Sequence, residues 1–141
     1  MTDVERKEHI EYRIQNARKT IEELKTHIEN KFWNTAGNRM YYACFYAVGA
    51  LLMKSGISAS SHSGTIRMFS QHFILTGKMK KELGKHFSEL FEKRQRGDYG
   101  DLFDFDEETI VRLYGPSVEF INTVEALLNQ TSPDNSGATF T

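Results

Sequence analysis

Several features are scarce in this sequence of 141 residues, and each scarcity excludes a class of protein. A single cysteine, Cys44, excludes an intrachain disulfide framework and a metal site built from several cysteines. Only two prolines occur, Pro116 and Pro133, so long stretches contain no helix breaker. No apolar run approaches the ~20 residues that a membrane-spanning helix needs. The sequence therefore predicts long helices in a protein of a reducing compartment, the cytoplasm.

A surplus of charge is also missing. Eighteen Lys and Arg residues against nineteen Asp and Glu residues give a formal net charge of −1, so no overall basic field attracts nucleic acid. Any site for a polyanion must therefore be local. The charged N-terminal segment lacks the apolar run of a signal peptide. The length fits one domain with its own core, which we expect over residues 1–130, followed by a polar, disordered tail over residues 131–141.

Cofactor and metal motifs are missing as well. The sequence contains no glycine-rich loop that would hold a phosphate and no nucleophile elbow, so no cofactor is expected. The acidic segment from Asp98 to Asp106 lacks a glycine and a terminal glutamate at the spacing of a calcium loop. We interpret it as a solvated turn that ends in the helix cap Asp106, and we expect no metal.

Apolar spacing predicts an all-α fold. The first helix carries apolar residues at 4-3-4-3-4 spacing from Ile10 to Ile28, and such a stripe requires partner helices. The second is apolar around almost its whole circumference, which predicts a central helix or an additional oligomer interface. Gly115-Pro116 is expected to kink or split the last helix. The expected helices span residues 4–30, 35–54, 63–76, 80–96 and 107–129. Together they predict an up-and-down helical bundle of four long helices plus a shorter one.

Three motifs follow one another along the chain. Residues 38–47 read NRMYYACFYA, residues 62–64 read HSG, and residues 90–99 read LFEKRQRGDY. In this order they resemble the HEPN superfamily over residues 17–128, specifically the small prokaryotic branch that carries an RxxxDY element. The resemblance implies a HEPN-like helical bundle that is usually a homodimer. Many members are toxins that cut RNA without a metal, and many are paired with a nucleotidyltransferase-like antitoxin.

The resemblance places the functional site at the end of the fourth helix. Catalytic members carry an Arg that holds the RNA phosphate, followed after four to six residues by a His that exchanges protons. Here Arg94 occupies the Arg position, whereas Asp98 and Tyr99 stand in place of the His. A carboxyl group with an ordinary pKa of about 3.9 can act as a base but is a poor acid at neutral pH. Arg94, Asp98 and Tyr99 are the candidate catalytic residues, and the missing His favours phosphate binding over ribonuclease chemistry.

Four further residues are candidates for binding a nucleotide or RNA: Asn38, Arg39, Tyr42 and His62. Each candidate also has a purely structural interpretation. Arg94 could pair with Asp98 or extend along a helix end, and Arg39 could stack on an aromatic ring at the edge of the bundle. His62 could be a capping or turn residue, or it could supply the missing imidazole.

Two functions follow from the sequence. The first is the toxin component of a HEPN/nucleotidyltransferase toxin–antitoxin pair, which acts on RNA or binds a nucleotide through a dimer cleft containing Arg94. The second is a non-catalytic accessory domain that binds a nucleotide or a partner protein.

Overall fold

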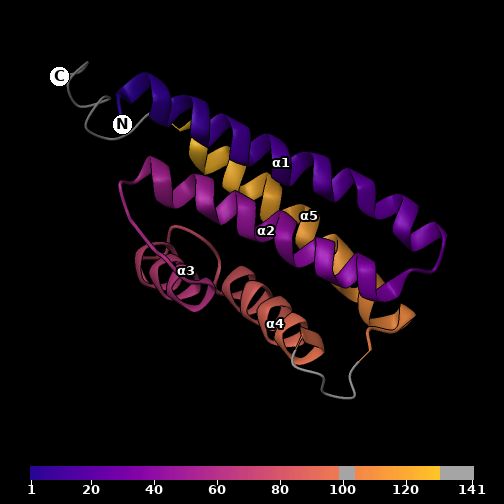
Figure 1. Ribbon diagram of the computed structural model, residues 1–141. Coiled ribbons are helices and arrows are strands. Elements are labelled where there is room, and N and C mark those ends of the chain that lie inside the picture. The colour runs from indigo at the N-terminus through magenta and orange to yellow at the C-terminus, as the bar shows by residue number, and fades with distance from the viewer. Residues whose placement is uncertain (99–103, 131–141) are drawn as a thin grey trace.

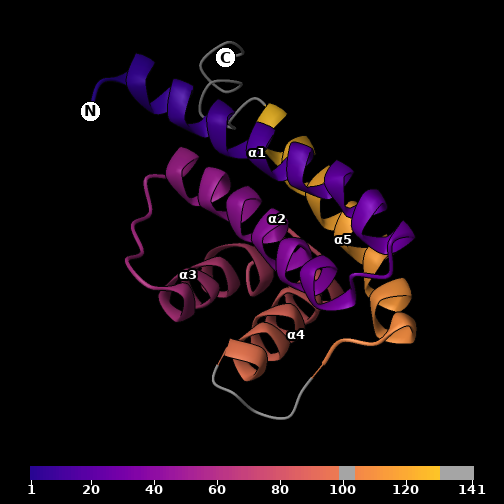
Figure 2. The same cartoon turned by 45° about the vertical axis from the view of Figure 1, so that its right-hand side comes forward.

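The structure, a computed structural model, describes residues 1–98 and 104–130. Within these residues the chain forms five α-helices and one short π-helix, and it contains no strand. The elements are α1 (Asp3–Glu29), α2 (Trp33–Lys54), α3 (His62–Phe69), the π-helix η1 (Ser70–Ile74), α4 (Lys81–Asp98) and α5 (Glu107–Asn129). The four long helices alternate in direction, and the short α3 lies beside α2 and α4 (Figures 1 and 2). The predicted all-α bundle is confirmed.

Local sequence signals set the helix ends. Thr2 and Glu5 form a capping box at the start of α1, and Asp106 accepts a hydrogen bond of 2.8 Å from the Thr109 backbone N–H at the start of α5. Gly56 and Gly77 follow the second helix and the π-helix with φ values of 72° and 80°, in the left-handed region that glycine adopts at low cost. The predicted cap Asp106 is therefore confirmed.

The expected split at Gly115-Pro116 does not occur, because α5 continues through Pro116 as one helix. Proline removes the hydrogen bond that the carbonyl of Arg112 would otherwise accept. Arg112 is exposed, so water can reach that part of the helix. The helix also has other support, since Ser117, Phe120 and Ile121 just beyond the proline are buried in the core. Tertiary packing thus outweighs the local preference.

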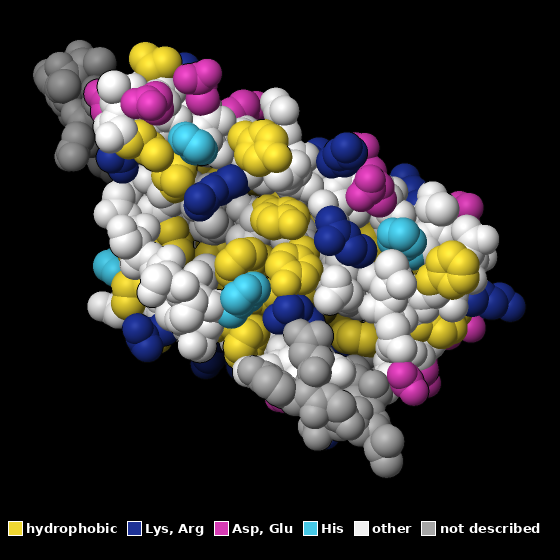
Figure 3. Space-filling model, in the orientation of Figure 1, with side chains coloured by type: hydrophobic (Ala, Val, Ile, Leu, Met, Phe, Trp, Pro, Cys, Tyr) yellow, Lys and Arg dark blue, Asp and Glu magenta, His cyan; other side chains and the backbone are white. Residues whose placement is uncertain are grey.

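The second helix lies at the centre of the bundle and contacts α1, α3, α4 and α5. Most of its circumference is buried, as its apolar composition predicts. One strip is only half-buried, and it presents the rings of Tyr42, Phe45 and Tyr46, which we call the aromatic face of α2. In Figure 3, hydrophobic side chains gather over α2, and Lys, Arg and His side chains lie beside them. This face supplies the surface on which the candidate site is built.

Candidate functional site

Arg94 projects from the last part of α4 onto two rings of α2. Its Nη2 donates a hydrogen bond of 2.7 Å to the hydroxyl of Tyr42. Its Cζ lies 4.9 Å from the centroid of the Tyr42 ring and 5.3 Å from that of Tyr41. A guanidinium group is weakly hydrated and stacks readily on aromatic faces, so this position suits Arg better than Lys. The rings and the hydroxyl together fix the direction of a permanent positive charge.

The sequence of α4 explains why Arg94 arrives there. Leu83, Phe87 and Leu90 form the buried stripe of this helix, and Arg94 comes four residues after Leu90 on the same face. Phe87 stacks on Tyr41 at 5.8 Å with an interplanar angle of 11°, which aligns α4 with α2. The stripe thus changes from apolar to cationic where the helix reaches the edge of the core.

His62 reaches the same rings from α3. Its Nδ1 shares a hydrogen bond of 2.6 Å with the hydroxyl of Tyr41, and its ring stacks on Phe45 at 4.4 Å and 13°. Ser61, one residue earlier, is the cap of α3, because its hydroxyl accepts a hydrogen bond from the Gly64 backbone N–H. The capping role considered for His62 is therefore wrong. His62 instead packs against Tyr41 and Phe45, and its role as an imidazole of the site stays a prediction.

Tyr41 connects Arg94 and His62, since its ring lies near the Arg94 guanidinium and its hydroxyl shares a hydrogen bond with the His62 imidazole. The side chain is completely buried, and burial raises the pKa of Tyr41 although the nearby Arg94 charge lowers it. The phenol consequently keeps its proton at neutral pH and can hold the imidazole in one orientation. The sequence alone did not single out Tyr41 as a site residue. The only sequence signal for a role of Tyr41 in the site was its position next to Tyr42 in the motif, one helical turn before Phe45.

Arg39 also lies near the ring of Tyr42. Its Cζ is 6.0 Å from the centroid of that ring, and its Nη2 donates a hydrogen bond of 3.4 Å to the hydroxyl of Thr20 on α1. Asn38 is half-buried on α2, one helical turn before Tyr42. The stacked position expected for Arg39 is thus observed, and it also brings a second guanidinium to the Tyr42 ring. We call Arg39, Tyr41, Tyr42, His62 and Arg94 the Arg94 cluster.

The two remaining candidates lie at the limit of the described structure. Asp98 is the last residue of α4, four residues after Arg94, and its side chain is outside the described part. Tyr99 lies outside the described residues. Both assignments stay predictions. Beyond this gap, Asn34 accepts a hydrogen bond of 2.7 Å from the Phe105 backbone N–H and donates one of 2.8 Å to Asp104, which ties the returning chain to the start of α2.

The cluster combines two kinds of chemistry. Arg94 and Arg39 supply charges that pH does not remove, and planar guanidinium groups suit phosphate oxygens. His62 adds the one side chain that normally exchanges protons near neutral pH. Within residues 1–98 and 104–130, no group of three or more His, Cys, Asp or Glu residues could hold a metal ion. No helix in the same ranges is long and apolar enough to cross a membrane.

Comparison with known proteins finds similarity over most of the chain. Residues 10–127 match the sequence profile of the HEPN domain. A "UPF0332 protein" of Thermotoga maritima is 40% identical over 124 residues, covering 88% of this chain and 94% of that protein. A protein of Methanocaldococcus jannaschii named "Putative toxin MJ0142" is 31% identical over 122 residues, 86% of this chain and 83% of its own length. A second protein of that organism, "Putative toxin MJ0605", is 27% identical over 124 residues, 88% of this chain and 92% of its own length.

Proposed function

Because this chain belongs to the HEPN domain family, we propose that it is a toxin-type HEPN protein that acts on RNA at the Arg94 cluster. One observation carries the proposal: α2, α3 and α4 bring the Arg94 guanidinium and the His62 imidazole onto the same pair of tyrosine rings. The His62 ring centroid lies 6.1 Å from that of Tyr42, and the Arg94 Cζ lies 4.9 Å from it. The names of the two M. jannaschii relatives support the toxin assignment.

The proposed reaction is metal-independent cleavage of a phosphodiester. A base removes the proton of the ribose 2′-hydroxyl, and the 2′-oxygen attacks the adjacent phosphorus. The bond from phosphorus to the 5′-oxygen breaks, an acid protonates that oxygen, and the products carry a 2′,3′-cyclic phosphate and a 5′-hydroxyl. Arg94 would bind the negatively charged phosphate oxygens. His62 would exchange the protons, and Asp98 would be a further base.

The assembly is part of the same proposal. The aromatic face of α2 is half-buried in one chain, and residues at the end of α4 lie at its border. Two copies that meet at the end of α4 would bring two Arg94 side chains to one cleft, as the family resemblance implies for a homodimer. A nucleotidyltransferase-like antitoxin is the proposed partner, and it would act by covering or modifying this cleft.

A cleavage assay with labelled single-stranded RNA in excess EDTA tests the proposal. We expect Arg94→Ala to slow cleavage by about 100-fold or more, since removing one group that stabilises developing negative charge costs about 10² to 10³. His62→Gln should have an effect of similar size, since general acid–base catalysis contributes factors of about 10² to 10⁴. Arg96→Ala is the matched control, because it removes the same charge two residues further along α4 at a side chain that is 51% exposed. Cleavage that both Arg94→Ala and His62→Gln leave unchanged would rule out this site.

A second function is favoured by a different observation. Asp98 and Tyr99 replace the family histidine, and Arg94 is stacked and hydrogen-bonded in the single chain. A non-catalytic domain that binds a nucleotide or a partner protein at the Arg94 cluster accounts for this. It predicts nucleotide binding by wild-type protein that Arg94→Ala abolishes, with no RNA cleavage by either protein.

A further inference from the structure

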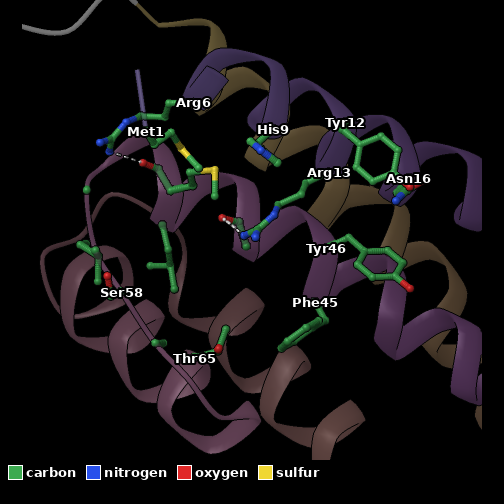
Figure 4. A pocket seen from close by; sticks show the side chains of 16 residues that line it. Met1, Arg6, His9, Tyr12, Arg13, Asn16, Phe45, Tyr46, Ser58 and Thr65 are labelled. Atoms are coloured by element: carbon green, nitrogen blue, oxygen red, sulfur yellow. Dashed lines mark hydrogen bonds between the residues drawn. The ribbon is translucent and has the colours of Figure 1, made fainter. Parts of the chain in front are cut away.

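A groove lies beside the Arg94 cluster, between the first half of α1, the second half of α2 and the segment that joins α2 to α3. Its volume is about 740 Å³, within the range of about 300–1,000 Å³ typical of ligand sites. Figure 4 shows Arg6, His9, Tyr12 and Arg13 reaching toward it from α1, and Phe45 and Tyr46 from α2. None of the candidate residues whose side chains the structure describes lines this groove.

The charged side chains among the described lining residues of the groove are positive. Arg6, His9, Arg13 and Asn16 follow one another along α1 at 3-4-3 spacing and so share one side of the helix. Among the described residues that line the groove, none is Asp or Glu. The Nη1 of Arg6 donates to the Met53 carbonyl at 3.4 Å, and that of Arg13 donates to the Gly49 carbonyl at 3.3 Å. Two guanidinium groups are thus anchored to the wall in a protein whose net charge is −1.

Aromatic rings alternate with these charges. The Tyr12 side chain stands at the rim and is 66% exposed, whereas Phe45 and Tyr46 are half-buried in the wall. Proteins that bind single strands combine a basic groove, which follows the phosphates, with aromatic rings on which bases stack. An acidic peptide would use the charges but would not require the exposed ring. The combination therefore favours a nucleic acid strand.

The groove is continuous with the Arg94 cluster. Phe45 lines the groove and also stacks on His62, and the Tyr46 ring lies 5.9 Å from that of Tyr42. Eleven residues of α2 separate Tyr42 from Met53, a rise of about 16 Å at ~1.5 Å per residue. A ligand that spans this distance must be longer than one nucleotide. Unpaired bases are also required, because stacking on a ring needs an accessible base face.

From these observations we infer that the groove binds a single-stranded RNA segment whose phosphates contact Arg6 and Arg13 and whose bases stack on Tyr12 and Tyr46. The inference rests on the proposed function, since the strand continues from the Arg94 cluster. The groove would add affinity and a preference for substrates of several nucleotides. Its binding can be measured without cleavage, so the two ideas can fail separately.

Fluorescence anisotropy with a labelled 12-nucleotide 2′-O-methyl RNA, which lacks the attacking hydroxyl, tests the inference over a series of potassium chloride concentrations. Each phosphate neutralised on a single strand contributes about −0.7 to the slope of log affinity against log salt. We expect Arg6→Gln and Arg13→Gln each to make the slope shallower by about 0.7 and to weaken binding severalfold. Tyr12→Ser should weaken binding about fivefold or more.

Lys7→Gln is the matched control, because Lys7 is exposed next to Arg6 but does not line the groove. It should change affinity less than twofold. Equal affinity and slope for Arg13→Gln and Lys7→Gln would overturn the inference. It would also be overturned if sedimentation showed that Arg6→Gln and Arg13→Gln dissociate a dimer without weakening RNA binding, since the groove would then hold a second copy. RNA binding that needs Arg13, in a protein that cuts no RNA, would support the groove and refute the proposed cleavage.

Discussion

Acidification should destabilise this protein through one buried histidine, His86 on α4. The residue is 7% exposed, and its Nε2 shares a hydrogen bond of 2.8 Å with the hydroxyl of Ser117 on α5. Burial, together with the nearby Arg112 charge, lowers the pKa of His86 to about 4, although Glu89 and Glu119 act in the opposite direction. His86 is therefore neutral in the folded protein at neutral pH.

The size of the effect follows from this shift. Between the ordinary pKa of about 6.5 and the folded value, the unfolded chain binds a proton that the folded protein does not. The contribution to folding is thus complete above pH ~6.5 and is lost as the pH falls toward ~4. Each pKa unit corresponds to about 1.4 kcal/mol. With a discount for the part of the ring that water reaches, the expected loss is about 2–3 kcal/mol.

Urea unfolding of the wild-type protein and of His86→Gln, at one protein concentration and at pH values from 7.5 to 4, measures this loss. The glutamine can retain a hydrogen bond to Ser117 but does not titrate. We expect the free energy of unfolding of the wild type to fall by about 2–3 kcal/mol more than that of His86→Gln. A carboxylate away from His86, such as Asp106, whose pKa is lowered by hydrogen bonds to Thr109, affects both proteins equally. Parallel pH profiles for the two proteins would refute the argument.

Three other predictions concern single positions. Lys31 has a φ of 60°, so Lys31→Gly should raise the free energy of unfolding by about 0.5–1 kcal/mol in urea titrations, and a decrease would contradict this. A Cβ on Gly37 would lie 2.4 Å from the Phe105 ring, so Gly37→Ala should lower the melting temperature through a loss of about 1–3 kcal/mol. An unchanged melting temperature would show that the ring moves freely. Cys44 is fully buried and burial raises its pKa, so Ellman's reagent should label it only after unfolding.

Much of the fold could be predicted because its signals are local. The apolar stripe from Ile10 to Ile28 and the apolar circumference of the second helix predict helices without any knowledge of their partners. The cap at Asp106 and the glycine at position 77 likewise act within a few residues. Pro116 shows the limit of such reasoning, because the buried residues beyond it keep α5 continuous.

The candidate site could be predicted only in part. The motif spacing singled out Arg94, Tyr42, Arg39 and His62, and the structure brings these four together. The sequence could not place His62 against Tyr41 and Phe45, because that contact depends on how α3 packs against α2. It also could not reveal that Tyr41 connects His62 to Arg94. Asp98 and Tyr99 stay predictions from the resemblance.

The scarcities of the sequence by themselves determined a helical protein without disulfides and with no overall basic field. Only the tertiary structure decided where the charges gather. In the sequence, Arg6 and Arg13 look like ordinary charged positions on an amphipathic helix. The packing of α1 against α2 places them at a groove whose described lining residues include no Asp or Glu. The physical reason is that periodicity assigns a residue to a side of its own helix, whereas a site requires sides of several helices to meet. Whether those sides of different helices come together depends on packing between segments that are far apart in the chain.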